Sequence, residues 1–183
     1  MPVSSIVIRR RLLGRYRVKK MKNNSRKKNL KLVSVSPGQT REIGSRLARA
    51  LAPGDVIFLR GRLGSGKTVF AKGIAAGLGI NAAKVISPTF VLIREYRGGR
   101  IPLYHFDLYR LDGPQQAAPL GLEEYIQGNG VCVVEWPEKL GCMEYSQYLQ
   151  VNIGLNEQGK KEQRVLEFIP RGERYMRLLE SLK

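Results

Sequence analysis

The sequence predicts one α/β domain, built on a mixed, partly parallel sheet that is flanked by helices. A length of 183 residues suits a single domain. In the first half of the chain, short apolar runs alternate with segments of helical periodicity, whereas the second half consists mostly of strand-like segments. Alternating strands and helices are typical of parallel pairing, and successive strands joined by turns are typical of antiparallel pairing. The two patterns together indicate a mixed sheet.

The first helix has a complete start signal. A short strand is predicted at Lys31–Ser36, where the ordered domain begins. Ser36 suits the N-cap, Pro37 the first helical position, and Gln39 the residue whose side chain reaches back to the cap. The apolar face of this helix recurs at four-residue spacing, at Ile43, Leu47 and Leu51. Pro53, followed by glycine, is expected to end the helix.

The middle of the chain predicts a strand, a helix and a β-hairpin. A buried strand is expected over Asp55–Gly61, and a helix from Gly66 to about Leu78. Two strand-like segments, Thr89–Tyr96 and Arg100–Leu111, flank the dipeptide Gly98-Gly99. Because a glycine pair between two strand-like runs is typical of a turn, these segments are predicted to pair as a hairpin.

The last third predicts an interior strand, a strand pair and a terminal helix. A loop with Pro114 and Pro119 leads to a short helix around Leu122–Tyr125. The run Val131–Val134 is continuously apolar and mostly β-branched, which is typical of a strand buried on both faces. Three further segments complete the fold, namely antiparallel strands at 148–155 and 163–170 around a polar turn at 156–160, and a helix at 171–183.

Positive charge is concentrated at the N-terminus. The formal net charge is +17, yet residues 1–31 hold twelve Lys and Arg and no acid, which leaves +5 for the remainder. Residues 1–30 are therefore predicted to form a basic, disordered extension, and residues 31–183 the ordered domain. Three interpretations of the extension stay open: an arm with salt-sensitive affinity for RNA, a targeting segment, or a stretch upstream of a start at Met21.

Composition excludes several classes of protein. No apolar run approaches the roughly 18 residues that a membrane helix needs, so no membrane association is expected. Cys132 and Cys142 are isolated cysteines outside any Cys-x-x-Cys or Cys/His cluster, which argues against a disulfide framework and a structural zinc site. Both are interpreted as reduced thiols.

The stretch "GRLGSGKT" at residues 61–68 carries the strongest functional signal. It follows a predicted buried strand and opens a predicted helix, which is the context that a P-loop requires. Glycines at 61, 64 and 66 let backbone N–H groups approach phosphate oxygens, and the helix N-terminus adds its dipole. Lys67 is expected to reach the β- and γ-phosphates, and Thr68 to bind Mg²⁺. These residues predict a P-loop NTPase-like domain.

Two acids are candidates for the carboxylate that a P-loop enzyme places near Mg²⁺. Glu135 ends the apolar run 131–134, and Asp107 lies among strand-forming aromatic residues; a buried carboxylate at either place is costly unless it meets a cation or a donor. A salt bridge or hydrogen-bonded strand end is the alternative for each. Thr89 of "SPTF" could direct a hydroxyl at the γ-phosphate or its Mg²⁺, or belong to an edge turn. His105 is interpreted as a packing residue.

Missing motifs narrow the class of nucleotide enzyme. The chain has no Asn-Lys-x-Asp for guanine and no Asp-x-x-Gly switch, which disfavours a conventional GTPase. It also lacks room for the additional domains of a translocating motor. A small-molecule kinase stays open, although no clear arginine-rich lid follows the core strands.

Four stretches together resemble one family. "GDVIFLRGRLGSGKTVFAKGIAAGLGI", "VISPTFVLIREY", "PLYHFDLYRL" and "VCVVEWPE" occur in the order and spacing of the bacterial TsaE (YjeE) family, and the resemblance covers about residues 35–140. It implies a cytoplasmic P-loop ATPase that uses ATP and Mg²⁺. It further implies a role in forming threonylcarbamoyladenosine at adenosine 37 of tRNAs that read codons beginning with adenine. The implied partners are TsaD and TsaB, whose complex ATP hydrolysis resets, with tRNA contacted indirectly or through the basic extension.

The resemblance also implies roles for individual residues. Catalytic roles fall to Lys67, Thr89, Asp107 and Glu135, with Asp107 as a water-positioning or metal-linked acid. Mg²⁺ binding falls to Thr68 and Glu135. Nucleotide contacts fall to Gly61, Gly64, Ser65, Gly66, Lys67, Thr68, Val69, Trp136 and, near the adenine, Thr40.

The chain departs from the family pattern at a few positions. Arg62 stands where Asp is usual and Val69 where Thr is usual, and neither side chain is expected to contact phosphate or Mg²⁺. Gln115 and Gln116 stand where acids are common, which concerns partner affinity rather than nucleotide binding. Two alternative functions stay open: a small-molecule kinase, and a nucleotide-gated binding protein whose hydrolysis is incidental.

Overall fold

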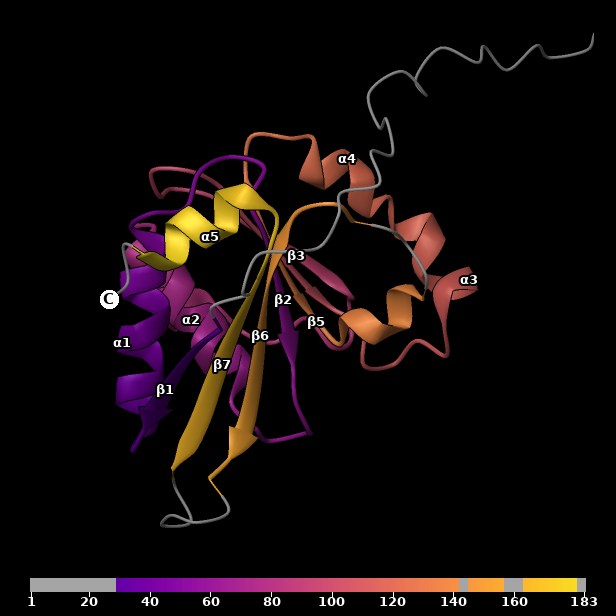
Figure 1. The fold of residues 1–183 in the computed structure, drawn as a ribbon. Coiled ribbons are helices and arrows are strands. Elements are labelled where there is room, and N and C mark those ends of the chain that lie inside the picture. Colours follow the sequence, from indigo (N-terminus) through magenta and orange to yellow (C-terminus); the bar gives the residue numbers. More distant parts are fainter. Residues whose placement is uncertain (1–28, 142–144, 157–162, 181–183) are drawn as a thin grey trace, which may run out of the picture.

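The structure, a computed structural model, describes residues 29–141, 145–156 and 163–180. Residues 1–28 of the predicted basic extension, Cys142 and almost all of the polar turn at 156–160 lie outside these residues. Within them, the predicted mixed sheet is confirmed (Figure 1). No helix in the described ranges is long and apolar enough to cross a membrane.

The described residues form one seven-stranded sheet in the order β1-β7-β6-β2-β5-β4-β3. The strands are β1 Leu30–Ser34, β2 Val56–Arg60, β3 Ile93–Tyr96, β4 Leu103–Asp107, β5 Val131–Glu135, β6 Tyr148–Leu155 and β7 Arg164–Arg171. β2 pairs parallel with β5 and β6, and β4 pairs parallel with β5. β3 and β4, β6 and β7, and β1 and β7 pair antiparallel, which confirms the predicted hairpin and the predicted late strand pair.

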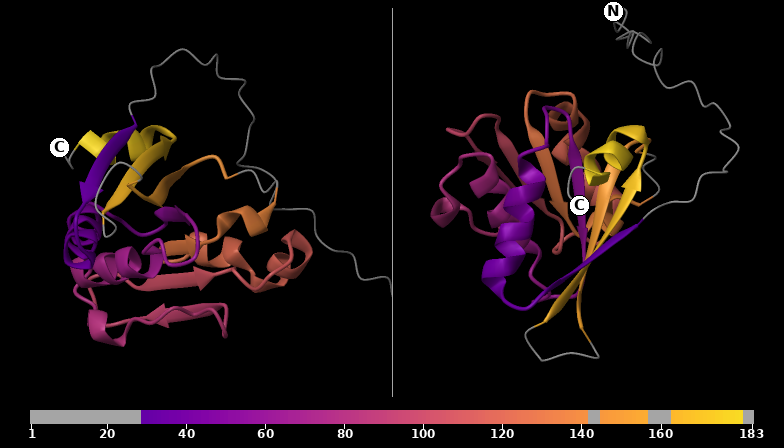
Figure 2. Two further views of the ribbon diagram at one scale, coloured as in Figure 1. Left: turned by 90° about the horizontal axis from the view of Figure 1, so that it is seen from below. Right: turned by 60° about the vertical axis from the view of Figure 1, so that its left-hand side comes forward.

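Helices cover both faces of the sheet (Figures 1 and 2). The α-helices are α1 Pro37–Ala48, α2 Lys67–Gly77, α3 Pro114–Ala117, α4 Leu122–Ile126 and α5 Glu173–Glu180, and the 3₁₀ turns are η1 Ala82–Lys84, η2 Ala118–Leu120 and η3 Pro137–Leu140. α1, α2 and α5 pack on one face, whereas α3, α4 and η3 pack on the other. The short helix α3 lies where the sequence predicted a loop.

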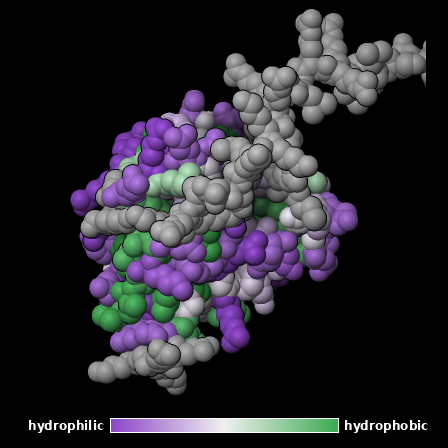
Figure 3. Space-filling view, viewed as in Figure 1, coloured by the Kyte–Doolittle hydropathy of each residue, from purple (hydrophilic) through white to green (hydrophobic). Residues whose placement is uncertain are grey.

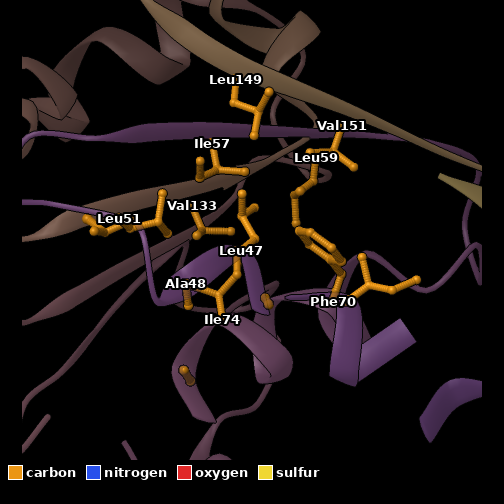
Figure 4. Close-up of a cluster of buried hydrophobic side chains, with 14 of the residues drawn as sticks. Leu47, Ala48, Leu51, Ile57, Leu59, Phe70, Ile74, Val133, Leu149 and Val151 are labelled. Atoms are coloured by element: carbon orange, nitrogen blue, oxygen red, sulfur yellow. The ribbon is translucent and has the colours of Figure 1, made fainter. Parts of the chain in front are cut away.

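Alternate residues of the central strands enter two separate cores. Ile57 and Leu59 of β2 join one core with α1 and α2, whereas Val56 and Phe58 join the other. Val133 of β5 belongs to the first core and lies with Leu47, Ile74 and Phe70 in Figure 4. Because both faces of these strands are covered, their sequences are continuously apolar, as predicted for an interior strand.

The predicted cap of α1 is confirmed with one difference. The hydroxyl of Ser36 accepts a hydrogen bond from the Gln39 N–H at 3.2 Å, and Pro37 opens the helix. The Gln39 side chain accepts from the N–H of Val35 at 2.7 Å, one residue before the cap. The helix ends at Ala48, earlier than predicted, because the following residues tighten into a 3₁₀-like turn that still buries Leu51.

The strands predicted at Thr89–Tyr96 and Arg100–Leu111 are longer than the observed β3 and β4. For β3, the reason is a turn that precedes the strand. Thr89–Leu92 lie in a turn before β3, in which the Leu92 N–H donates to the Pro88 carbonyl at 2.6 Å. Leu92 has a φ of 64°, which a strand does not contain. β4 ends at Asp107 rather than at Leu111. The shorter strands bring Thr89 and Asp107 together at one edge of the sheet.

Edge strand β1 leaves apolar side chains at the surface. Val33 of β1 and Val35, just after the strand, are about half exposed, at 49% and 52%. Figure 3 shows hydrophobic residues at the surface over β1, whereas hydrophilic residues cover most of the rest of that view. The inward side chains Leu30 and Leu32 pack against the core of the α1 face.

The C-terminal helix is fastened to the start of β2. The Arg174 guanidinium donates to the Asp55 carboxylate at 2.7 Å, and the buried Tyr175 hydroxyl accepts from the Val56 N–H at 2.6 Å. Backbone donors that are buried need an acceptor, because an unsatisfied N–H costs free energy. Tyr175 therefore satisfies a strand end that has no ladder partner there.

Replacing Tyr175 by Phe is expected to lower the free energy of unfolding by about 1–3 kcal/mol, because the Val56 N–H loses its acceptor in the interior. Urea denaturation followed by circular dichroism measures the change. Tyr148→Phe is the matched control, since its ring packs against Phe58 and its hydroxyl has no hydrogen bond in the described part of the chain. Equal destabilisation in both variants would contradict this role of Tyr175.

Candidate nucleotide-binding site

The candidate site lies where three parallel strands end. β2, β5 and β4 are neighbours, and their register places Leu59 beside Glu135 and Glu135 beside Asp107. Because the carboxyl ends of parallel strands meet at the same edge, the two acids lie side by side although 28 positions separate them in the sequence. The glycine-rich loop between β2 and α2 faces this edge.

A cavity of about 390 Å³ gathers most of the residues that the sequence analysis singled out. Those lining it are Gly64, Gly66, Lys67, Thr68, Val69, Thr89, Asp107, Glu135 and Trp136. Leu63, Ser87 and Tyr109 line it as well. Ser65 and Thr40 do not, and instead line a second cavity of about 240 Å³ together with Arg164. Gly61 lines neither of these cavities.

The loop has the backbone shape of a phosphate cradle. Gly64 and Gly66 have φ values of 76° and 107°, which residues with a Cβ rarely adopt. α2 begins at Lys67 with Gly66 as its N-cap, and no side chain caps the first turn. The first N–H groups of a helix lack partners within the helix, so this end suits an anion.

Lys67 holds the loop from inside. Its buried ammonium donates to the carbonyls of Gly61 at 2.8 Å and Arg62 at 3.1 Å, and lies 3.9 Å from the centroid of the Trp136 ring. Burial lowers the pKa of Lys67, while the carboxylates of Glu135 and Asp107, among others, act in the opposite direction. The ammonium is thus a desolvated cation beside the cradle, where a phosphate charge interacts with it strongly.

Glu135 is buried and is held by two donors. Its Oε1 accepts from the Thr68 hydroxyl at 2.9 Å and lies 2.9 Å from Nε2 of His105. His105 is fully buried, and its Nδ1 has no partner among the described residues, so Nε2 is the natural N–H donor. The histidine thus does more than pack, because it orients the carboxylate. Its place two residues before Asp107 on the same face of β4 is the sequence signal that could have revealed it.

Asp107 is bound to the Ser-Pro-Thr turn. Its Oδ2 accepts from the hydroxyls of Ser87 at 2.6 Å and Thr89 at 2.5 Å, and its Oδ1 accepts from the Tyr109 N–H at 3.1 Å. The structure therefore places Thr89 directly against the second acid. Sequence analysis missed Ser87, although its position two residues before Thr89 puts both hydroxyls within reach of one carboxylate.

Trp136 closes the site with a strained backbone. It has a φ of 61°, and its ring lies 5.0 Å from that of Tyr109. A residue with a large side chain in this region costs free energy, and such strain clusters at functional sites. The conformation turns the chain sharply after Glu135, and the indole then lies beside Lys67.

The site residues fit a nucleotide with Mg²⁺. Thr68 and Glu135 offer a hydroxyl and a carboxylate, which are ligands that Mg²⁺ prefers. No group of three or more His, Cys, Asp or Glu in the described ranges could hold a metal. A cation here would therefore complete its coordination with phosphate oxygens and water, as Mg²⁺ usually does in nucleotide enzymes.

Thr40 lies on the other side of the loop. It is buried in the first turn of α1, and its hydroxyl lies 2.7 Å from that of Ser34 and donates to the Ser36 carbonyl at 3.3 Å. The second cavity that it lines shares Gly64, Gly66 and Val69 with the first. The two cavities thus meet at the loop, with Thr40 at one end and the acids at the other.

Comparisons with known proteins identify relatives of the chain. Residues 34–165 match the family model described as threonylcarbamoyl adenosine biosynthesis protein TsaE. The tRNA threonylcarbamoyladenosine biosynthesis protein TsaE of Bacillus subtilis is 43% identical over 155 residues, covering 85% of this chain and 94% of that protein. The protein of the same name from Nostoc sp. is 39% identical over 142 residues, covering 75% and 86%. The crystal structure of Bacillus subtilis YdiB matches with a TM-score of 0.70 and 39% identity, covering 85% and 94%.

Replacing His105 by Ala is expected to raise the Mg²⁺ concentration needed for Mg²⁺-dependent nucleotide binding by about 10-fold or more, because Glu135 loses the donor that orients it. Nucleotide affinity without Mg²⁺ should stay unchanged. Isothermal titration calorimetry at graded Mg²⁺ concentrations measures both quantities.

Two further variants control this experiment. His105→Gln keeps an N–H donor and is expected to retain most of the Mg²⁺ affinity. Tyr104→Phe alters the neighbouring residue of β4, whose ring packs on Tyr125, and should leave the Mg²⁺ requirement unchanged. If His105→Ala needed no more Mg²⁺ than the parent, His105 would not orient Glu135.

Proposed function

The chain belongs to the TsaE family and acts in the formation of threonylcarbamoyladenosine in tRNA, and from this premise we propose that it is a Mg²⁺-dependent ATPase. The resemblance predicted from the four sequence motifs is confirmed by the family match. One observation carries the ATPase proposal: the loop lysine, the helix N-terminus and two buried acids line one cavity. We further propose that ATP hydrolysis resets a complex with TsaB and TsaD during modification of adenosine 37 in tRNAs reading codons that begin with adenine.

Positioning and electrostatics account for the proposed hydrolysis. Lys67 and the N–H groups from Gly64 to Thr68 surround the β- and γ-phosphates and stabilise charge that spreads over the transferred group. Thr68 and Glu135 would hold Mg²⁺, which would neutralise phosphate charge. Asp107, with the hydroxyls of Ser87 and Thr89, orients the attacking water.

Water suits this site better than a small metabolite as the acceptor of the transferred phosphoryl group. A kinase that transfers phosphate to a metabolite commonly closes a basic lid over the transferred group, to neutralise its charge and exclude water. The segment 108–138, which follows β4 and includes α3 and α4, contains one basic residue, Arg110, and no Lys. This composition supports hydrolysis over metabolite phosphorylation.

Apolar side chains at the mouth of the cavity support a protein partner. Leu63 and Tyr109 line the cavity and are 72% and 44% exposed. Phe90 follows Thr89, is 82% exposed, and lies 4.2 Å from the Arg110 guanidinium carbon. Large apolar side chains gathered at the surface are typical of protein–protein contacts. A partner on this surface would lie next to the turn that holds Asp107.

ATPase activity is expected to rise when TsaB and TsaD are added, and Lys67→Ala is expected to lower the stimulated rate at least about 100-fold, because charge on the transferred group loses its main cation. Phosphate release measured with and without the pair tests this. Lys72→Ala, five residues further along α2, is the matched control and should retain activity. Absence of stimulation in the parent protein would contradict the partner proposal.

The same assay distinguishes a protein whose function needs ATP hydrolysis from one that needs only nucleotide binding. Glu135→Gln is expected to bind ATP yet lose hydrolysis and repeated tRNA modification. If this variant supported repeated modification at the parent rate, hydrolysis would be incidental, and the chain would act as a nucleotide-gated binding protein.

We also propose that the basic segment 1–29 contacts tRNA, because eleven positive charges without an acid suit a phosphate backbone. Deleting residues 1–29 is expected to weaken tRNA binding and to flatten its dependence on salt, because every phosphate that the protein neutralises adds about 0.7–0.9 to the steepness of log K against log salt. Fluorescence anisotropy at several salt concentrations measures the slope. An unchanged slope would exclude the segment from tRNA binding.

A further inference from the structure

Arg164 contacts the glycine-rich loop from a distant strand. It is the first residue of β7 and lies opposite Ser34 of β1 and Leu155 of β6. Its Nε donates to the backbone carbonyl of Ser65 at 3.1 Å, across 99 positions of sequence. A guanidinium is permanently charged, so this is a charge-assisted hydrogen bond to the loop.

The contact determines which way a loop peptide faces. The peptide bond between Ser65 and Gly66 is trans, so its C=O and N–H groups point in opposite directions. Holding the Ser65 carbonyl toward Arg164 therefore turns the Gly66 N–H away from Arg164. Gly66 lines the cavity that also contains Lys67 and Thr68, and its N–H belongs to the predicted phosphate cradle.

The loop needs such a restraint because glycines flank Ser65. Gly64 and Gly66 both have positive φ, and a Cβ built at either would meet nothing within 4 Å. The N–H of the buried Ser65 donates to the Arg62 carbonyl at 3.1 Å, which holds the peptide before Ser65. The peptide after Ser65 turns about the φ of Gly66, where no Cβ opposes the rotation. Lys67 holds the carbonyls of Gly61 and Arg62, which lie earlier in the loop. Arg164 holds the later part, where Lys67 does not reach.

We propose that Arg164 is a positioning residue for the phosphate cradle, which aims the Gly66 N–H at the nucleotide phosphates by holding the Ser65 carbonyl. The inference rests on the proposed nucleotide binding. It adds to the site a residue that lies outside the motif and outside the strands that carry the acids.

Arg164 also lines the second cavity beside Thr40, and this provides a test of how it acts. A residue that acts through the cradle affects every ligand that places a phosphate there, whether or not a nucleoside is attached. A residue that instead contacts the nucleoside affects ADP and leaves pyrophosphate unchanged. The two ligands therefore separate the two modes of action.

Arg164→Met is expected to weaken binding of ADP and of pyrophosphate by a similar factor, about 10-fold or more, because one charge-assisted hydrogen bond is removed. Isothermal titration calorimetry measures both affinities. The backbone amide signal of Gly66 in a ¹H–¹⁵N spectrum of the nucleotide-free protein should also shift or broaden. Arg62→Met, which removes a positive charge from the loop without touching the Ser65 carbonyl, is the matched control and should leave the Gly66 signal in place.

Three results would overturn the inference: unchanged affinities in Arg164→Met, an equal weakening in Arg62→Met, or a weakening with ADP alone. If the parent protein bound neither ADP nor pyrophosphate, the proposed function would fail. The Gly66 signal would then decide alone whether Arg164 positions the loop, and an unmoved signal would refute it.

Discussion

The parallel pairing of β4, β5 and β2 is the constraint on which the site depends. It aligns Asp107, Glu135 and Leu59 across one edge of the sheet, directly beside the loop that leaves β2. Parallel neighbours require long crossover connections, and the connection from β2 to β5 carries α2 on one face and α3 and α4 on the other. The same strand pairing therefore brings the two acids together and separates the two hydrophobic cores. A change in this pairing would alter both the site and the cores.

The two buried carboxylates at this edge of the sheet have hydrogen-bond donors and a cation close by. Glu135 and Asp107 are each 3% exposed, and a buried carboxylate is costly unless donors or a cation satisfy it. Thr68 and His105 satisfy Glu135, whereas Ser87 and Thr89 satisfy Asp107. Lys67 supplies the cation. Such an arrangement contributes less to stability than an apolar core would, which is why it points to function.

The features that could be predicted from the sequence are those that a short, contiguous stretch of residues determines. The apolar run 131–134 and the loop at 61–68 were identifiable because each is a contiguous signal. Glu135 was found because it ends that apolar run, and Asp107 because an acid among strand-forming aromatic residues is unusual. The strand order, and the contacts of His105, Ser87 and Arg164, depend on residues far apart in the chain. A lone histidine in a strand has the same local pattern whether it packs or binds, and only its neighbour on β5 distinguishes the two.

Arg62 shows why the side chain at a loop position need not alter the cradle. Lys67 uses the backbone carbonyl of Arg62, and every residue type offers that carbonyl. The Arg62 side chain is exposed, as is that of its neighbour Leu63, which lines the mouth of the cavity. The Arg62 side chain thus leaves the internal geometry of the loop intact and places a positive charge at the rim. Since rim charges act on the rate and selectivity of association more than on bound geometry, the effect of Arg62 belongs to the encounter with a partner or a nucleotide.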